Sequence, residues 1–220
     1  HMYSFFVEDE PPVPEWPYKE PNNPEAIDAL SEVYFNSGYD IKEMLRFLFK
    51  SDFFKTEKVW NKRVKSPIEL VAGTLRLTKE FYRPEKFQSA TKSQTSIMGQ
   101  HAMNPPSVEG WHTGAEWIDG GTLNERINFA VNQFNDVNTP GFQDMLIRLG
   151  DSVKSGDLLG KCLDLVGMLE VGDETQEALG RYSDAVGDLD LSSDQARTEN
   201  AEKVARMIQL IVSTREYQFA

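Results

Sequence analysis

The chain has 220 residues, 40% of them hydrophobic, and a formal net charge of −12. This length and apolar content suffice for one large packed domain or two small ones, which excludes disorder of the whole chain. Mean hydropathy is −0.48. No run approaches the ~18–20 apolar residues that span a bilayer, so the sequence predicts no membrane span.

Negative charge is concentrated in the second half of the chain. Residues 1–100 hold 14 Lys+Arg and 15 Asp+Glu, whereas residues 101–220 hold 9 and 20. Phosphate backbones need a clustered basic surface, so nucleic acid is not an expected partner. We interpret the acidic half as a solvated surface that favours solubility. The single cysteine, Cys162, excludes an internal disulfide framework, and its apolar neighbours predict a core position.

Helix-start signals recur in the first half of the chain. Asn23–Pro24 predicts a helix that Gly38 closes, and Asp40 caps the next one, so the two should form an antiparallel hairpin. Ser66–Pro67–Ile68–Glu69 is a capping box that predicts a helix to about Tyr82. The polar segment 86–96 is expected to follow without helix, before a short helix that reaches about residue 101.

The second half is predicted to continue as helices. Thr122–Leu123–Asn124–Glu125 is interpreted as a second capping box, and Thr139–Pro140 opens the helix after it. Three more helices are expected at about 155–170, 173–186 and 193–214. No segment shows the period-two alternation of a strand. The predicted fold class is all-α, an irregular multi-helix bundle of about eight helices with long Pro/Gly/Trp-containing loops.

The predicted domain organisation is simple. Residues 1–2 are interpreted as a cloning scar, and residues 3–24 as a proline-rich extended lead-in that Trp16 and Tyr18 pin against the body. Residues 25–220 are predicted to form a single all-α domain, with a candidate sub-boundary in the polar segment 135–139.

The segment 104–134 is the most informative part of the chain because it sets an Asn-Pro-Pro turn, two tryptophans and several glycines before a capped helix. Tryptophan rings can stack on a sugar ring while amides and carboxylates bind its hydroxyls. The commoner alternative is structural, in which the indole N–H bonds a loop carbonyl and the ring covers a helix end. The candidate ligand-binding residues are Asn104, Glu109, Trp111, His112, Glu116, Trp117 and Arg126.

Two local expectations accompany this loop. Arg126 is predicted to reach back to Glu109 or Glu116 and so lock the loop in place. The glycines are interpreted as loop residues that need unusual backbone angles, and they are Gly110, Gly114, Gly120 and Gly121.

Metal binding and catalysis are weaker interpretations of the same region. His101 and His112 with Glu109, Glu116 and Asp119 are metal-ligand types, but their spacing matches no ligand motif, so no metal is predicted. A hydrolase acting on glycans or esters would use the carboxylates near Trp111. Nucleophile elbows, phosphate loops and dinucleotide motifs are missing, and no cofactor is expected.

A second acidic segment partly matches a calcium loop. Asp188, Asp190, Ser192, Asp194 and Glu199 occupy several ligand positions. Ser193 stands where the loop needs glycine, so the simpler interpretation is that Ser192 or Ser193 caps the last helix.

Four segments resemble one protein family. They are Ser37–Phe54, Val64–Arg76, the tryptophan segment from Asn104–Pro105–Pro106 through Trp111 and Trp117 to Ala130, and Leu210–Gln218. In this order they are similar to the bacterial family of domain of unknown function 1800. The resemblance implies no assigned reaction. It implies export to the periplasm or the extracellular space, and a chain that is the C-terminal half of a longer protein. His112 departs from the family pattern, so no role is carried over to it.

Together these features predict a binding or assembly module organised around the Asn104–Trp117 loop. Its expected partners are the N-terminal half of the same protein, and a carbohydrate or another protein. The alternatives that stay open are the hydrolase and a purely structural half of a larger helical protein.

Overall fold

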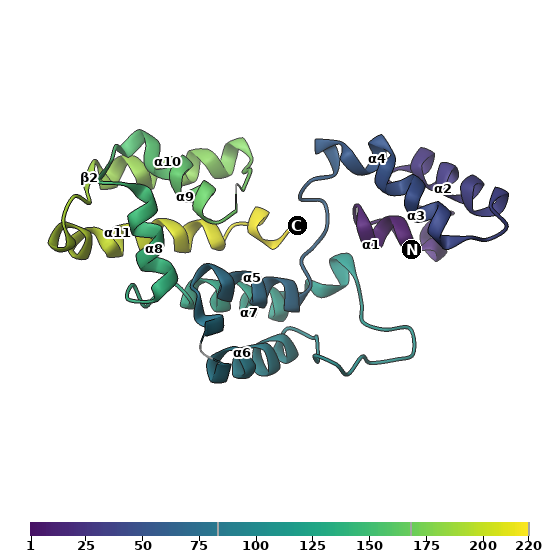
Figure 1. Ribbon diagram of the computed structural model, residues 1–220, viewed down its shortest axis with the longest axis horizontal. Helices are drawn as coiled ribbons and strands as arrows, with labels where there is room; N and C mark the ends of the chain where they lie inside the picture. Colours follow the sequence, from purple (N-terminus) through teal and green to yellow (C-terminus); the bar gives the residue numbers. More distant parts are fainter. Residues whose placement is uncertain (83, 168, 220) are drawn as a thin grey trace. The chain divides into compact units, whose positions relative to one another are not determined.

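The computed structural model describes residues 1–82, 84–167 and 169–219. Within these ranges the chain is predominantly helical, with eleven α-helices, two of which (α1 and α4) have five residues or fewer. The strands in these ranges make one two-stranded ladder. The predicted all-α fold class is confirmed (Figure 1). No helix in the described part of the chain is both long and apolar enough to cross a membrane.

The chain divides into two compact units. The first comprises residues 1–64 and 113–116 with Phe219, and the second comprises residues 65–112 and 117–218. The division follows Val64, whereas the segment 135–139 lies inside the second unit.

The first unit contains the predicted helical hairpin. Helix α2 (Pro24–Asn36) is capped by Asn23, and α3 (Ile41–Lys50) by the carboxylate of Asp40, which accepts two backbone N–H bonds. Gly38, at φ 71°, follows α2 as predicted. The remaining short elements are α1 (Met2–Phe6), η1 (Val13–Glu15), α4 (Asp52–Lys55) and η2 (Glu57–Val59). Its core consists of Tyr3, Val7, Ala26, Leu30, Leu48 and Val59.

The proline-rich segment differs from its prediction. It starts within helix α1 and includes the turn η1, so it is not extended throughout. The Trp16 indole donates to the Pro11 carbonyl at 2.8 Å, which holds the segment against itself. Tyr18 is 93% exposed and pins nothing. The carboxylate of Glu10 instead accepts the backbone N–H groups of Asn22 and Asn23, closing the segment into a loop.

The second unit packs its helices around α11 (Asp194–Val212), which contacts α7 (Gly120–Asn132), α8 (Pro140–Leu149), α9 (Ser155–Leu165) and α10 (Asp173–Val186). Cys162 of α9 is fully buried in this core, and burial raises the pKa of its thiol to about 12, as expected of a core cysteine. The other elements of this unit, in order, are α5 (Pro67–Leu77), η3 (Glu80–Tyr82), α6 (Pro84–Ile97), β1 (Ser152–Val153), β2 (Leu189–Asp190) and η5 (Glu216–Gln218). The turn η4 (Gly114–Trp117) belongs to the first unit up to Glu116 and to the second from Trp117.

Helices α5 and α8 approach each other through a glycine. The N–H of Gly141 donates to the Thr78 carbonyl at 3.1 Å. A Cβ at Gly141 would lie 2.1 Å from the Leu77 carbonyl oxygen, closer than atoms can approach. Only glycine fits there, because backbone, which cannot rotate away as a side chain can, occupies the space.

Two helix predictions in the first half of this unit were wrong. The segment 86–96, expected to be non-helical, belongs to α6. Tertiary packing holds this polar helix: α6 packs on α5, and Met98 directly after it is fully buried in the core. The hydroxyls of Ser93 and Ser96 are accommodated by bonds to the Ser89 and Lys92 carbonyls one turn back. Helix α5 ends at Leu77 instead of Tyr82, because Lys79 takes a positive φ of 56°.

The start of α7 was also misplaced. Asp119 is its N-cap, and Thr122 is the third helical residue, whose hydroxyl accepts the Asp119 N–H at 2.9 Å. Gly120 and Gly121 therefore lie inside the helix and do not take positive φ angles, unlike Gly110 and Gly114.

In the acidic segment that partly matches a calcium loop, aspartate carboxylates accept hydrogen bonds from backbone N–H groups. Ser193 caps α11 through the Ala196 N–H, as predicted. Asp188 accepts the Ser155 N–H at 2.9 Å, and Asp190 accepts the Ser192 N–H at 2.9 Å. Strands β1 and β2 pair antiparallel beside it, which the sequence pattern did not predict because each has two residues.

Candidate functional site

The loop after α6 is closed at its base by a tryptophan. The Trp111 indole donates to the His101 carbonyl at 3.2 Å, and the Asn104 N–H bonds the same carbonyl at 3.1 Å. Two backbone conformations with positive φ, at Met103 and Gly110, help the chain to turn within this span. The tip pairs Ser107 with Gly110 in an isolated bridge. This is the structural use of tryptophan that the sequence favoured: one indole N–H satisfies a loop carbonyl.

The second tryptophan is part of the core. Trp117 is 5% exposed, and its carbonyl accepts the Thr122 hydroxyl at 3.0 Å, so it is fixed to the start of α7. The His112 ring lies edge-on to it, with centroids 6.4 Å apart. Backbone N–H bonds from Thr122 and Gly121 lower the pKa of the Asp119 carboxyl. Asp119 thus serves as a helix cap.

Arg126 has other partners than the sequence suggested. It is fully buried, with Nε donating to Gln218 Oε1 at 2.9 Å and Nη2 to the Lys65 carbonyl at 2.7 Å. Glu109 and Glu116 are not its hydrogen-bond partners. The buried atoms Arg126 Nη1 and Gln218 Nε2 have no hydrogen-bond partner among the described residues. Arg126 therefore joins α7 to the C-terminal turn η5 and the start of α5, and does not reach a ligand from the loop.

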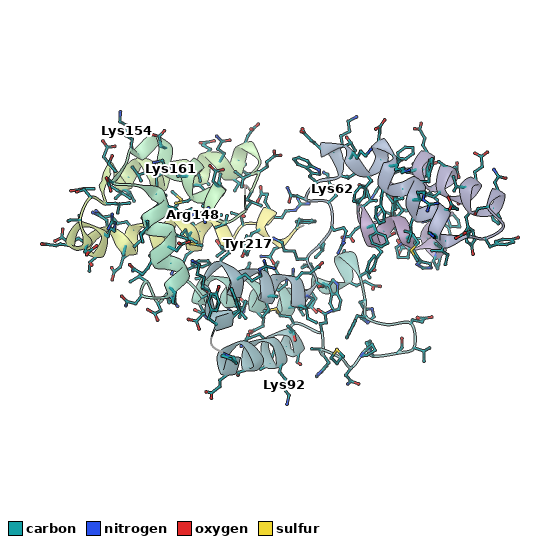
Figure 2. All side chains as sticks on the ribbon, viewed as in Figure 1. Lys62, Lys92, Arg148, Lys154, Lys161 and Tyr217 are labelled. Carbon is teal, nitrogen blue, oxygen red and sulfur yellow. The ribbon has the colours of Figure 1, made fainter. Side chains whose placement is uncertain are left out.

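Lys65 completes this buried cluster. Its ammonium donates to the Tyr217 carbonyl at 2.9 Å and lies 4.5 Å from the centre of the Tyr217 ring, which Figure 2 labels. Burial and the positive charge of Arg126 lower the pKa of Lys65 to about 8, while Glu69 opposes the shift. Burial likewise lowers the pKa of Arg126 to about 10. The cluster is a structural junction, because its contacts are mainly to backbone carbonyls.

A surface depression lies between α6 and the base of the tryptophan loop. It has a volume of about 540 Å³. At its centre His101 Nδ1 lies 3.2 Å from Ser96 Oγ. Lys92 projects outward from α6 (Figure 2). The lining residues are Ser89, Lys92, Ser93, Ser96, His101, Ala102 and Asn104.

The structure places few of the predicted site residues at this depression. Of the predicted ligand-binding set, Asn104 lines it, and Trp111 supports it through the His101 carbonyl. Glu109, His112 and Glu116 are exposed and are not among its lining residues. No group of three or more His, Cys, Asp or Glu side chains in the described part of the chain could hold a metal ion.

Sequence reasoning missed the serine and lysine side of the depression. Ser89, Ser93 and Ser96 recur at four- and three-residue spacing with Lys92 between them, which places them on one face of a helix. That spacing could have been recognised, but the segment was interpreted as non-helical because it lacks apolar periodicity.

The fold and site describe an all-helical protein with a polar surface depression beside a tryptophan-closed loop. Residues 1–219 match a family model described as protein of unknown function (DUF1800). The chain belongs to this family, and the resemblance found in the sequence is confirmed. No curated protein and no solved structure matches the chain.

Proposed function

We propose that this chain is a binding module that holds a hydroxyl-rich ligand, an oligosaccharide, in the depression between α6 and the tryptophan loop. The observation that carries the proposal is the lining itself, which combines three serines, an imidazole, an amide and a lysine. Such groups donate to and accept from hydroxyls in several directions, as carbohydrate recognition requires.

The pairing of Ser96 and His101 favours binding over hydrolysis. The Ser96 hydroxyl donates to the Lys92 carbonyl at 2.6 Å. Its oxygen therefore accepts from His101, 3.2 Å away, and the imidazole carries its proton on Nδ1. A nucleophilic serine needs the reverse arrangement, with its own proton directed at the base. The other ring nitrogen of His101, Nε2, is then left to exchange a hydrogen bond with a ligand hydroxyl.

The carboxylate mechanism has less support. Glu109 and Glu116 were the candidate acid and base, and both are exposed and do not line the depression. A glycosidase needs two carboxyl groups flanking one bond, and the lining residues that the structure describes include no carboxylate.

Thermal unfolding with a panel of oligosaccharides tests the proposal. A ligand at 100 times its dissociation constant stabilises the folded state by about 2.7 kcal/mol. The stabilisation should be lost in Asn104→Ala and kept in Asn138→Ala, a matched exposed loop asparagine outside the depression. Stabilisation of equal size in both variants, or none with any sugar, would reject the depression as the binding site.

We propose the cellular location and one partner of the module from the family resemblance. The module acts outside the cytoplasm of a bacterium, together with an N-terminal half of the same protein. Fractionation of cells that produce the native gene product tests the location, because recovery with cytoplasmic markers would contradict it.

A further inference from the structure

Four phenylalanine rings form a connected row in the first unit. The Phe5 and Phe6 ring centres are 4.8 Å apart, those of Phe6 and Phe49 are 5.1 Å apart, and those of Phe49 and Phe54 are 5.1 Å apart. All three contacts are edge-to-face, the favourable geometry for aromatic pairs. The row joins α1, α3 and α4, so residues from three helices contribute to one surface.

Part of this row faces solvent. Phe5 is 64% exposed and Phe49 is 40% exposed, although each touches another ring. The two exposed rings are joined through Phe6, which is part-buried. Single exposed apolar residues are ordinary on a protein surface, whereas a connected group of rings is a candidate contact site for an apolar partner.

Basic residues adjoin the ring-bearing residues in the chain or bond their backbone. Lys50 follows Phe49 in α3, and the Lys55 ammonium donates to the Lys50 carbonyl at 2.8 Å. At the other end Arg63 Nη1 donates to the Phe5 carbonyl at 2.7 Å. We name these six residues the aromatic–basic patch: Phe5, Phe49, Phe54, Lys50, Lys55 and Arg63.

The segment that carries five of the six patch residues is basic. Residues 41–64 hold seven Lys+Arg and three Asp+Glu, whereas residues 1–64 as a whole hold eight and twelve. One of the three acidic residues, Glu43, is paired with Arg46. The local excess of positive charge selects an anionic occupant.

We propose that the aromatic–basic patch binds the surface of a membrane that contains anionic phospholipids. Exposed rings enter the boundary between headgroups and acyl chains, while lysine and arginine remain at the level of the phosphates. A polyanion in solution would use the cations but leave the apolar rings uncovered. The lipid surface satisfies both features, and the contact is peripheral, in keeping with the helices described above.

Co-sedimentation with vesicles tests this proposal on the whole chain. Equal parts of phosphatidylglycerol and phosphatidylcholine should bind the protein, phosphatidylcholine alone should not, and added salt should weaken the binding. Each basic residue near an anionic surface changes partitioning roughly five-fold. Lys50→Ala with Lys55→Ala should therefore weaken binding by about twenty-five-fold, with the helical circular dichroism spectrum unchanged.

Two control proteins sharpen the test. The charge-preserving pair Lys50→Arg with Lys55→Arg should bind as the parent does. Arg148→Ala with Lys154→Ala removes two exposed charges from the second unit (both labelled in Figure 2) and should also leave binding unchanged. Phe5→Ser should weaken binding without loss of charge, which separates the rings from the cations.

Three results would overturn the proposal. Equal binding to neutral and anionic vesicles would remove the role of charge. Binding to duplex DNA or polyglutamate with no binding to vesicles would assign the patch to a soluble polyanion. Concentration-dependent self-association that Phe5→Ser abolishes, again without vesicle binding, would assign it to a second copy of the chain.

Discussion

Arg126 and Gln218 are joined by a 2.9 Å hydrogen bond from the guanidinium Nε to the amide Oε1, although they lie 92 residues apart in the sequence. Both side chains are buried, and the same guanidinium bonds the carbonyl of Lys65. The guanidinium thus ties η5 to α7 and to Lys65, two residues before α5.

Arg126→Ala should destabilise the protein by about 3 kcal/mol, because it leaves the Gln218 amide and the Lys65 carbonyl buried without their partner. Urea unfolding measures the change. Arg148→Ala, an exposed arginine of α8, should change stability by less than about 0.5 kcal/mol. If the two variants were equally stable, the junction would not contribute to folding.

Gly141→Ala should destabilise the protein by about 2–3 kcal/mol, because the added methyl group meets the Leu77 carbonyl and forces α5 and α8 apart. Gly73→Ala is the matched control: this glycine lies inside α5, and a Cβ there meets nothing within 4 Å. It should stabilise the helix by about 0.5–1 kcal/mol. Chemical denaturation should therefore show changes of opposite sign in the free energy of unfolding for the two variants. Changes of the same sign would contradict the prediction.

Lys65 should make stability depend on alkaline pH. Its pKa is lowered to about 8 from 10.5, so the folded state binds fewer protons than the unfolded state between these values. Stability of the parent should therefore rise with pH relative to Lys65→Met in this window. Urea unfolding of both proteins between pH 8 and 10.5 checks the sign. A difference between them that stays constant or falls would show that the ammonium is not desolvated.

Asp119 should make the start of α7 sensitive to acid. Backbone N–H bonds from Thr122 and Gly121 lower the pKa of its carboxyl, so its contribution is present above the unfolded pKa and is lost as pH falls through the folded one. Asp119→Asn keeps an oxygen acceptor that does not titrate in this range. Below about pH 4, the melting temperature of the parent should fall more steeply with decreasing pH than that of the variant. If the two melting temperatures fell in parallel, Asp119 would not be a source of the acid sensitivity.

Trp111→Phe should make the loop more mobile while an aromatic ring still fills the site of the indole. The ring is kept, but the N–H bond to the His101 carbonyl is lost. Backbone hydrogen exchange should then become faster at residues 101–111, while the core helix α11 keeps its protection. Unchanged exchange in the loop would mean that packing of the ring alone closes it.

Local sequence signals were sufficient for much of the helical architecture. Asn23, Asp40, Ser66, Thr139 and Ser193 each cap the helix that they were predicted to cap. A cap acts on N–H groups two or three residues away, so its effect can be seen in a short window. The burial of Cys162 could likewise be predicted locally, from the apolar residues that surround it in the sequence.

The boundaries that failed depended on competing signals. Both Asp119 and Thr122 can cap a helix, and only the folded chain shows that the aspartate does so while the threonine returns a bond to it. In α6, the polar composition concealed a helix that tertiary packing holds, because α6 packs on α5 and Met98 directly after it is buried in the core.

The sequence by itself determined the all-helical class, most helix starts and the family, because these depend on residues that are neighbours in the chain. Tertiary structure alone decided the partners of Arg126, the approach of Gly141 to α5 and the depression that joins α6 to Asn104. Each of these brings together residues that lie far apart in the sequence or in different elements. Tertiary packing sets such distances, and no local pattern encodes them.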